Sequence, residues 1–275
     1  MKKQINGLLI EVFPPESPKF KSPLVFLHGL WSGSWCWRQW STHFSNLGWE
    51  CWVVNFRGRT GESRPETLAQ LTLQDCLEDL RQVIHALASP PILLAHSLGG
   101  LVAQKAAEEE ETAALILLSS LPPAGIQNRS SRPLRLLRLK YFPLMLLRRP
   151  MRIQDKDFSR YWLASLPEDQ RASVLRSLVP ESGHLVAELF HPTVSPEPGR
   201  IRCPVLVVAG GEDAVVPAAA TRELAQRLGA ELKEYPHHGH WMMGGEAGEE
   251  TVRDIHRWII QRLGETVLLA QLPES

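Results

Sequence analysis

Ser97 lies in the segment that points most directly to chemistry, Ile92-Leu93-Leu94-Ala95-His96-Ser97-Leu98-Gly99-Gly100. An apolar run of strand length leads into a helical pattern, so Ser97 falls on a sharp strand-to-helix turn. Ala95 and Gly99, two residues to either side, are small enough to permit a strained backbone there. A hydroxyl at the amino end of a helix is suited to nucleophilic attack, because the helix dipole favours a developing anion. A plain N-cap serine is the alternative interpretation.

A nucleophilic serine needs a general base, and His240 is our candidate. It follows the expected last strand, residues 231–235, and precedes the expected final helix. The nearby His237 and His238 are interpreted as solvated loop residues. Three close histidines also suggest a metal, but no further ligands are spaced to complete a site. We therefore expect no metal and no cofactor.

Asp213 is the candidate for the acid that orients the base. It follows the apolar run Val205–Ala209 and a short glycine loop, and parallel sheets place functional groups at the carboxyl ends of their strands. Glu212 is the alternative acid, and capping of the helix that starts at Pro217 is the alternative role for Asp213. In a serine–histidine–acid triad, the imidazole takes the proton of the serine hydroxyl while the acid orients the imidazole.

The backbone N–H groups of Leu30 and Leu98 are the candidates for an oxyanion hole. The apolar run Leu24–Leu27 is followed by His28-Gly29. Gly29 lets the chain turn so that the next N–H faces the serine, and the Leu98 N–H follows the serine directly. Each such donor contributes about 3 kcal/mol in the transition state. Taken alone, His28-Gly29 is also explained by a plain turn.

Alternating strands and helices must position these residues. Continuous apolar runs are typical of parallel strands covered on both faces. Between them lie helical patterns, one of which begins with a capping box formed by Thr72 and Asp75. The alternation predicts an α/β fold with a mostly parallel, doubly wound sheet. The predicted strands are Leu24–Leu27, Cys51–Asn55, Ile92–Ala95, Ala114–Leu118 and Val205–Ala209, and the predicted helices include residues 73–87, 98–111, 217–228 and 246–263.

One stretch interrupts the alternation. Between residues 121 and 202 there is no convincing strand, but there are proline-rich joints and short amphipathic helical patterns. About 80 residues is too long for a structureless loop in a compact domain. We therefore predict a helical cap, or lid, at residues 122–202, inserted into a core formed by residues 1–121 and 203–275.

These motifs together resemble the α/β-hydrolase fold superfamily, in its serine esterase and lipase-like branch with a helical cap. The order Ser97, Asp213, His240 is the nucleophile–acid–histidine order of that superfamily. The sequence departs at Ala95, where the usual pattern has glycine. Residues 53–63 look like the superfamily's structural D-x-R-G-x-G-x-S loop, with Asn55 in place of the acid.

A shorter resemblance links His28-Gly29 and Gly33-Ser34-Trp35-Cys36-Trp37 to the branch that holds plant methylesterases and hydroxynitrile lyases. A lyase is disfavoured, because Gly29 stands where the cyanohydrin-cleaving members carry threonine. An epoxide hydrolase or dehalogenase would need aspartate in place of Ser97.

The resemblance implies a carboxylic ester hydrolase that cleaves small to medium, largely apolar substrates through an acyl-enzyme on Ser97. Thioesterases and hydrolases of carbon–carbon bonds use the same triad, so both remain alternatives. A non-catalytic ligand receptor with a vestigial triad is the alternative of another class.

Trp31, Trp241 and His184 are the candidate substrate-binding residues. The predicted cap is also basic, since residues 126–152 carry eight basic side chains and no acidic one. A solvated basic side of an amphipathic helix is one interpretation. Transient contact with an anionic interface or a lipid-like substrate is the other. The eight are Arg129, Arg132, Arg135, Arg138, Lys140, Arg148, Arg149 and Arg152.

Composition limits the remaining function classes. The 275 residues include 30 basic and 30 acidic side chains, with a pI of about 7.2, so bulk charge does not favour a nucleic-acid partner. No apolar run reaches the roughly 18 residues of a membrane span, and no signal-peptide core follows the amino terminus. The four cysteines form no CxxC pair. We expect a cytoplasmic monomer or homodimer, without stable membrane insertion, that acts on a small-molecule ester.

Overall fold

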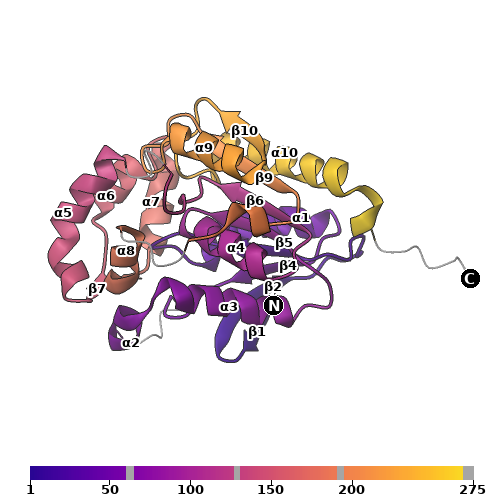
Figure 1. Cartoon of the computed structure of the whole chain (residues 1–275), viewed down its shortest axis with the longest axis horizontal. Helices are drawn as coiled ribbons and strands as arrows, with labels where there is room; N and C mark the ends of the chain where they lie inside the picture. Colours follow the sequence, from indigo (N-terminus) through magenta and orange to yellow (C-terminus); the bar gives the residue numbers. More distant parts are fainter. Residues whose placement is uncertain (60–64, 127–130, 191–194, 269–275) are drawn as a thin grey trace, which may run out of the picture.

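The computed structural model describes residues 1–59, 65–126, 131–190 and 195–268, and its centre is an eight-stranded sheet (Figure 1). The strand order is β1-β2-β4-β3-β5-β6-β9-β10. The β1–β2 and β2–β4 pairs are antiparallel, and all other neighbours are parallel, which confirms the predicted α/β fold class. The strands are β1 Lys2–Ile5, β2 Leu8–Phe13, β3 Leu24–Leu27, β4 Cys51–Val54, β5 Ile92–His96, β6 Ala114–Leu118, β9 Val205–Gly210 and β10 Glu231–Tyr235.

The central strands bring distant loops together. Every residue of β3, β5 and β6 is buried, as expected for apolar strands covered on both faces. In the parallel β3–β5 pair, Leu27 lies opposite Ala95. Gly29 and Ser97 each follow that pair by two residues, so the two leave the carboxyl edge of the sheet side by side.

The β1–β2 hairpin was not predicted from the sequence. Asn6 and Gly7 both have positive φ, 49° and 84°, as a two-residue type I′ turn requires. Along β2, buried residues alternate with half-buried ones. Only one face of this strand is fully buried, so β2 lacks the continuous apolar run by which the central strands were recognised.

Helices connect the strands. α3 begins with the predicted capping box, in which Thr72 Oγ1 accepts from Asp75 N at 3.2 Å and Asp75 Oδ2 accepts from Thr72 N at 2.9 Å. α1 and α10 pack together through Phe44 and His256, whose rings lie 5.9 Å apart. The helices are α1 Arg38–Asn46, α2 Pro65–Gln70, α3 Leu73–His85, α4 Leu98–Glu109, α9 Ala218–Leu228 and α10 Gly245–Leu263, with short 3₁₀ segments at Ser34–Trp37, Pro198–Arg200 and Gly264–Val267.

Residues 122–202 connect β6 to β9, and the α-helices among their described residues lie at one end of the molecule, on the left of Figure 1. The segment is mostly helical, with α5 Arg132–Leu146, α6 Asp155–Tyr161, α7 Glu168–Ser177 and α8 Gly183–Phe190. The expectation that it holds no strand was wrong: β7 Pro150–Met151 and β8 Glu181–Ser182 form a short antiparallel pair. Two residues per strand are too few to leave a hydrophobic period in the sequence.

Two buried contacts tie this segment to the sheet. The Arg59 guanidinium, just after β4, donates to both carboxylate oxygens of Glu181 at 3.2 and 2.7 Å, and both side chains are fully buried. Trp31 Nε1 donates to the Met151 carbonyl at 3.1 Å. Within the described ranges, no helix combines the length and apolar character needed to cross a bilayer.

Candidate active site

Ser97 stands at the turn between β5 and α4 in a strained conformation. Its φ of 54° and ψ of −116° lie in a region that costs a non-glycine residue about 1–3 kcal/mol. Its side chain makes no capping hydrogen bond, so the N-cap interpretation fails. A Cβ on Gly99 would lie 2.7 Å from the Leu27 carbonyl oxygen and 2.8 Å from that of His28. A glycine is needed there because α4 packs directly on the backbone after β3.

The backbone of the predicted oxyanion hole lies beside Ser97. A Cβ on Gly29 would lie 2.9 Å from Ser97 Cβ, so the chain leading to Leu30 passes directly along the serine. Leu98 is the first residue of α4, and its N–H is one of those that lack an intrahelical partner. The two predicted donors therefore come from segments that meet at Ser97.

His28 holds this turn in place. Its Nδ1 donates to the Gly29 carbonyl at 2.8 Å, and its Nε2 accepts a hydrogen bond from the backbone N of Phe56 at 3.4 Å. Burial, with a smaller contribution from the nearby Arg59 charge, lowers the pKa of His28 to about 3. The neutral ring thus connects the β3 and β4 loops without adding charge to the site.

His240 joins Ser97 to Asp213 in one line of hydrogen bonds. Its Nε2 lies 3.0 Å from Ser97 Oγ, and its Nδ1 lies 2.9 Å from Asp213 Oδ2. All three residues are buried. In this arrangement the Nδ1–H donates to the carboxylate, which leaves the Nε2 lone pair facing the serine hydroxyl.

Asp213, rather than Glu212, reaches His240. Asp213 Oδ1 accepts from the backbone N–H groups of Val215 and Val216, each at 2.8 Å, and this leaves Oδ2 for the imidazole. Glu212 points to the surface, where its carboxylate lies 3.3 Å from His237. The helix-capping alternative for Asp213 also fails, because α9 begins at Ala218 with Pro217 as its N-cap residue.

His96 supports His240 from behind as a packed, hydrogen-bonded side chain. Its Nε2 donates to the His240 carbonyl at 2.9 Å, and the two rings lie 4.8 Å apart. Burial, together with the neighbouring His240, holds the pKa of His96 well below its usual range. The neutral ring fixes the backbone that carries the candidate base, a contact that no sequence pattern indicated.

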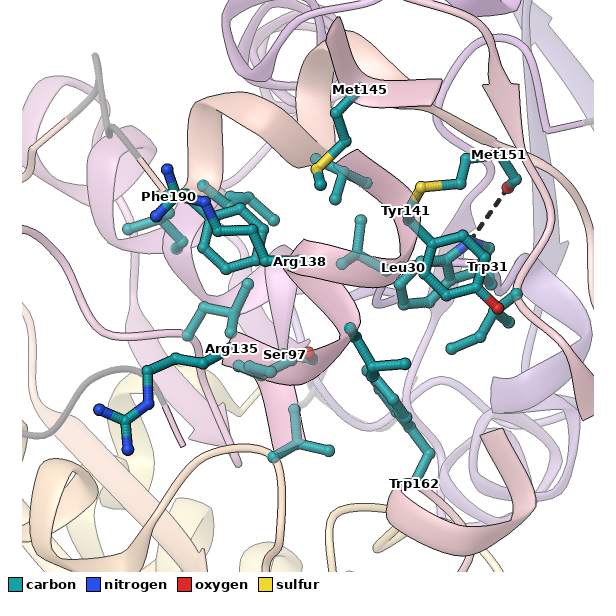
Figure 2. A pocket seen from close by; sticks show the side chains of 18 of the residues that line it. Leu30, Trp31, Ser97, Arg135, Arg138, Tyr141, Met145, Met151, Trp162 and Phe190 are labelled. Atoms are coloured by element: carbon teal, nitrogen blue, oxygen red, sulfur yellow. Dashed lines mark hydrogen bonds between the residues drawn. The ribbon is translucent and has the colours of Figure 1, made fainter. Parts of the chain in front are cut away.

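Ser97 opens into an apolar cavity of about 240 Å³ between the sheet edge and the 122–202 segment (Figure 2). In Figure 2, Trp31, Tyr141 and Met151 lie at one end and Arg135, Arg138 and Phe190 at the other, with Ser97 between them. The other lining residues are Leu30, Leu101, Leu121, Pro122, Leu134, Leu137, Met145, Ile153, Trp162, Val186, Leu189 and Val215.

Of the predicted substrate-binding residues, only Trp31 is among those that line this cavity. Trp241 stacks on Trp35, with ring centroids 5.7 Å apart, and meets His96 edge-on at 6.0 Å. It packs behind the histidines and is buried. His184 is half-buried on α8, and no described residue forms a hydrogen bond with its buried Nδ1. Trp241 follows His240 directly in the sequence, but its ring packs against Trp35 and His96 and does not line the cavity.

Two basic residues of the predicted cap, Arg135 and Arg138, line the cavity. The Arg138 guanidinium lies 5.1 Å from the centre of the Phe190 ring. Arg129 falls outside the described residues, and the Arg132 side chain is not described. No group of three or more His, Cys, Asp or Glu side chains suited to a metal occurs among the described residues.

Comparisons with known proteins find the same fold. Solved structures with the same fold include a monoacylglycerol lipase from Paleococcus ferrophilus (19% identity, 92% of this chain and 98% of that chain covered, TM-score 0.67). An esterase from Exiguobacterium antarcticum (19%, 94% and 98%, 0.72) and an esterase from Rhodococcus sp. ECU1013 (19%, 96% and 98%, 0.72) are also similar. A search of curated proteins found no significant match. The sequence profile of the alpha/beta hydrolase family matches residues 24–254, most of the chain, and the protein therefore belongs to that family.

Proposed function

We propose that the protein is a carboxylic ester hydrolase that works through an acyl-enzyme on Ser97. The observation that carries the proposal is the buried hydrogen-bonded line from Ser97 Oγ through the His240 ring to Asp213. The strained turn under Ser97 supports it, because backbone strain of this kind is retained where it holds a reactive group in place.

In the first half-reaction, His240 Nε2 takes the hydroxyl proton while Ser97 Oγ attacks the ester carbonyl. The oxyanion that forms accepts hydrogen bonds from the Leu30 and Leu98 N–H groups. The carbonyl then re-forms, the bond to the alcohol breaks, and His240 returns its proton to the departing oxygen. Asp213 holds the imidazole in one tautomer and stabilises its charged form.

In the second half-reaction, water takes the place of the alcohol. His240 removes a proton from the water, whose oxygen attacks the acyl carbon, and Ser97 leaves with the proton that His240 held. The carboxylic acid is released and the enzyme is restored. These steps need only the residues of the site and water.

The cavity supports a small to medium, largely apolar substrate. Its walls are mostly Leu, Met, Trp and Phe side chains, and its volume is about 240 Å³, at or below the small end of the usual range for ligand sites. We propose that residues 122–202 act as the cap that closes this cavity over Ser97. The names of the similar structures, lipase and esterase, are consistent with this substrate class.

A panel of p-nitrophenyl esters with increasing acyl length, measured beside acyl-CoA thioesters, tests the proposal. We expect ester hydrolysis to be fastest for short and medium chains, with Ser97→Ala lowering kcat at least about 1000-fold in a folded protein. Ser173→Ala, at an exposed serine on α7, is the matched control and should leave kcat unchanged.

The same panel separates the alternatives. Faster turnover of thioesters than of the matched esters would identify a thioesterase. No turnover of any substrate by the wild type would favour the ligand receptor. Retention of near wild-type activity by Ser97→Ala would reject the acyl-enzyme mechanism.

A further inference from the structure

The outward side of α5 exposes an unusual concentration of apolar side chains. We call Leu136, Leu139, Phe142, Leu146 and Leu147 the α5 outer face; their exposed fractions range from 48% to 74%. Among the described residues, these five make up more than half of the nine large apolar side chains that are exposed. A soluble monomer rarely gathers such residues on one helix, and when it does the patch marks an interaction site.

The cavity accounts for only the other side of α5. Leu134, Leu137, Tyr141 and Met145 line the cavity, and Figure 2 shows Tyr141 and Met145 turned toward it. At 3.6 residues per turn, these positions lie opposite the α5 outer face. A helix that is apolar on two sides is expected to be covered on both. In Figure 1, α5 is the outermost element at its end of the molecule.

Strong positive charge accompanies this outer face. Residues 131–152 hold seven basic side chains and no acidic one, although the whole chain has a formal net charge of zero. Arg135, Arg148, Arg149 and Arg152 are exposed, and none of them forms an ion pair with any described residue. Lys140 differs, because it pairs with Asp157. The free guanidinium groups thus lie on and just beyond the helix that carries the exposed leucines.

We propose that the α5 outer face docks on the surface of an anionic lipid bilayer. The five apolar side chains would enter the headgroup region, and the flanking arginines would face anionic headgroups, as in other amphipathic helices that lie in the membrane interface. Charge selects this partner over a second copy of the chain. A two-fold symmetric contact would place the same basic segment against itself, whereas an anionic surface complements it.

The position of the cavity gives this docking a consequence. Arg135 both lines the cavity and is exposed, so the cavity reaches the surface along α5. A docked molecule would therefore present this opening to the bilayer. The binding step itself does not depend on the chemistry proposed for Ser97, and it is tested without measuring hydrolysis of a lipid.

Vesicle flotation of the full chain tests the proposal. The vesicles are phosphatidylcholine alone, or phosphatidylcholine with about 30 mol% phosphatidylglycerol, at low and at high salt. We expect at least about tenfold stronger partitioning onto the anionic vesicles at low salt, and loss of that preference at about 0.5 M salt. Equal binding to both vesicle types, or binding to neither, would overturn the proposal.

Surface variants locate the binding face. Leu139→Ser/Leu146→Ser and, separately, Arg148→Gln/Arg149→Gln should each weaken binding to anionic vesicles at least about tenfold. The controls are Leu232→Ser/Ile260→Ser and Lys2→Gln/Lys21→Gln, at exposed positions outside residues 122–202, and both should bind as the wild type does. If the controls lose as much binding as the α5 variants, the α5 outer face is not the docking site.

Two further measurements complete the test. Circular dichroism should show the same unfolding midpoint for the α5 variants and the wild type, so that lost binding reports on the surface and not on the fold. Light scattering should show the same molecular mass for Leu139→Ser/Leu146→Ser as for the wild type. A dimer that these two substitutions dissociate would reassign the face to self-association and overturn the proposal.

Discussion

Replacing Asp213 with Asn changes one atom and is expected to reverse the proton arrangement of the site. Asp213 Oδ1 accepts two backbone N–H groups, from Val215 and Val216. In Asp213→Asn, the side-chain carbonyl must occupy that place, because an amide NH₂ there would face two donors. The NH₂ is then directed at His240 Nδ1, 2.9 Å from the present Oδ2.

The size of the effect follows from the tautomer. His240 Nδ1 must accept from the new amide, so its proton moves to Nε2, which faces Ser97 Oγ at 3.0 Å. The lone pair that takes the serine proton is lost while the shape of the site is kept. The equivalent change in a well-studied serine protease lowers kcat about 10⁴-fold, or about 5.5 kcal/mol of barrier. We expect a loss of that order here.

Steady-state hydrolysis of p-nitrophenyl butyrate measures this effect. Glu212→Gln, the same change at the adjacent exposed acid, is the control and should leave kcat unaltered. An Asp213→Asn protein that keeps more than about a tenth of the wild-type kcat would refute the reasoning, as would an equal loss in Glu212→Gln.

Three further changes should alter stability. Gly99→Ala forces a Cβ to within 2.8 Å of two carbonyl oxygens and should lower the free energy of unfolding by about 1–3 kcal/mol; an unchanged urea midpoint would contradict it. Glu181→Gln leaves the buried Arg59 charge uncompensated and should lower the free energy of unfolding by about 3–5 kcal/mol. Glu234→Gln, which breaks a surface ion pair with Arg222, is the control and should lower it by less than about 1 kcal/mol. Equal urea midpoints for the two variants would be inconsistent with this. Because burial lowers the pKa of His28 to about 3, the unfolded chain binds more protons below pH 6.5, and the free energy of unfolding should fall by about 2 kcal/mol from pH 7 to pH 5. Burial also lowers the pKa of His96, which acts in the same direction; urea denaturation that is equal at both pH values would exclude this effect.

The central fold was predictable because its strands are buried on both faces. Leu24–Leu27 and Ala114–Leu118 were predicted with the bounds that the structure has, since continuous apolar runs mark such strands clearly. The β1–β2 hairpin was missed because β2 buries alternate residues only. α1 was also missed, because Trp40 and Phe44 are the only apolar residues among its nine, too few to mark a helical period.

The candidate site was predictable only where the chain itself fixes the geometry. Ser97 and Leu98 are neighbours on one turn, and the strand ends bring Gly29 beside them. The choice between Asp213 and Glu212 required the structure, because it depends on which acid the Val215 and Val216 amides hold. These are contacts between atoms that no pattern of residue types specifies.

The cavity was the least predictable part. Its far wall comes from α5 and the β7 region, more than 100 residues from Trp31 in sequence. Which side of a helix faces a cavity depends on how the 122–202 segment sits on the sheet. Trp241 and His184 were therefore assigned by nearness in sequence to His240 and by position in the predicted cap, and neither lies among the residues that line the cavity.

Covalent labelling by a fluorophosphonate tests the central claim most directly. The probe phosphonylates only a serine whose proton a neighbouring base can remove, so it reports the Ser97–His240–Asp213 line without any assumption about the natural substrate. Digestion and mass spectrometry should find one adduct, on Ser97, and none in Ser97→Ala or in the wild type after heat denaturation. A wild-type protein that is unlabelled, or labelled equally in Ser97→Ala, would contradict the account.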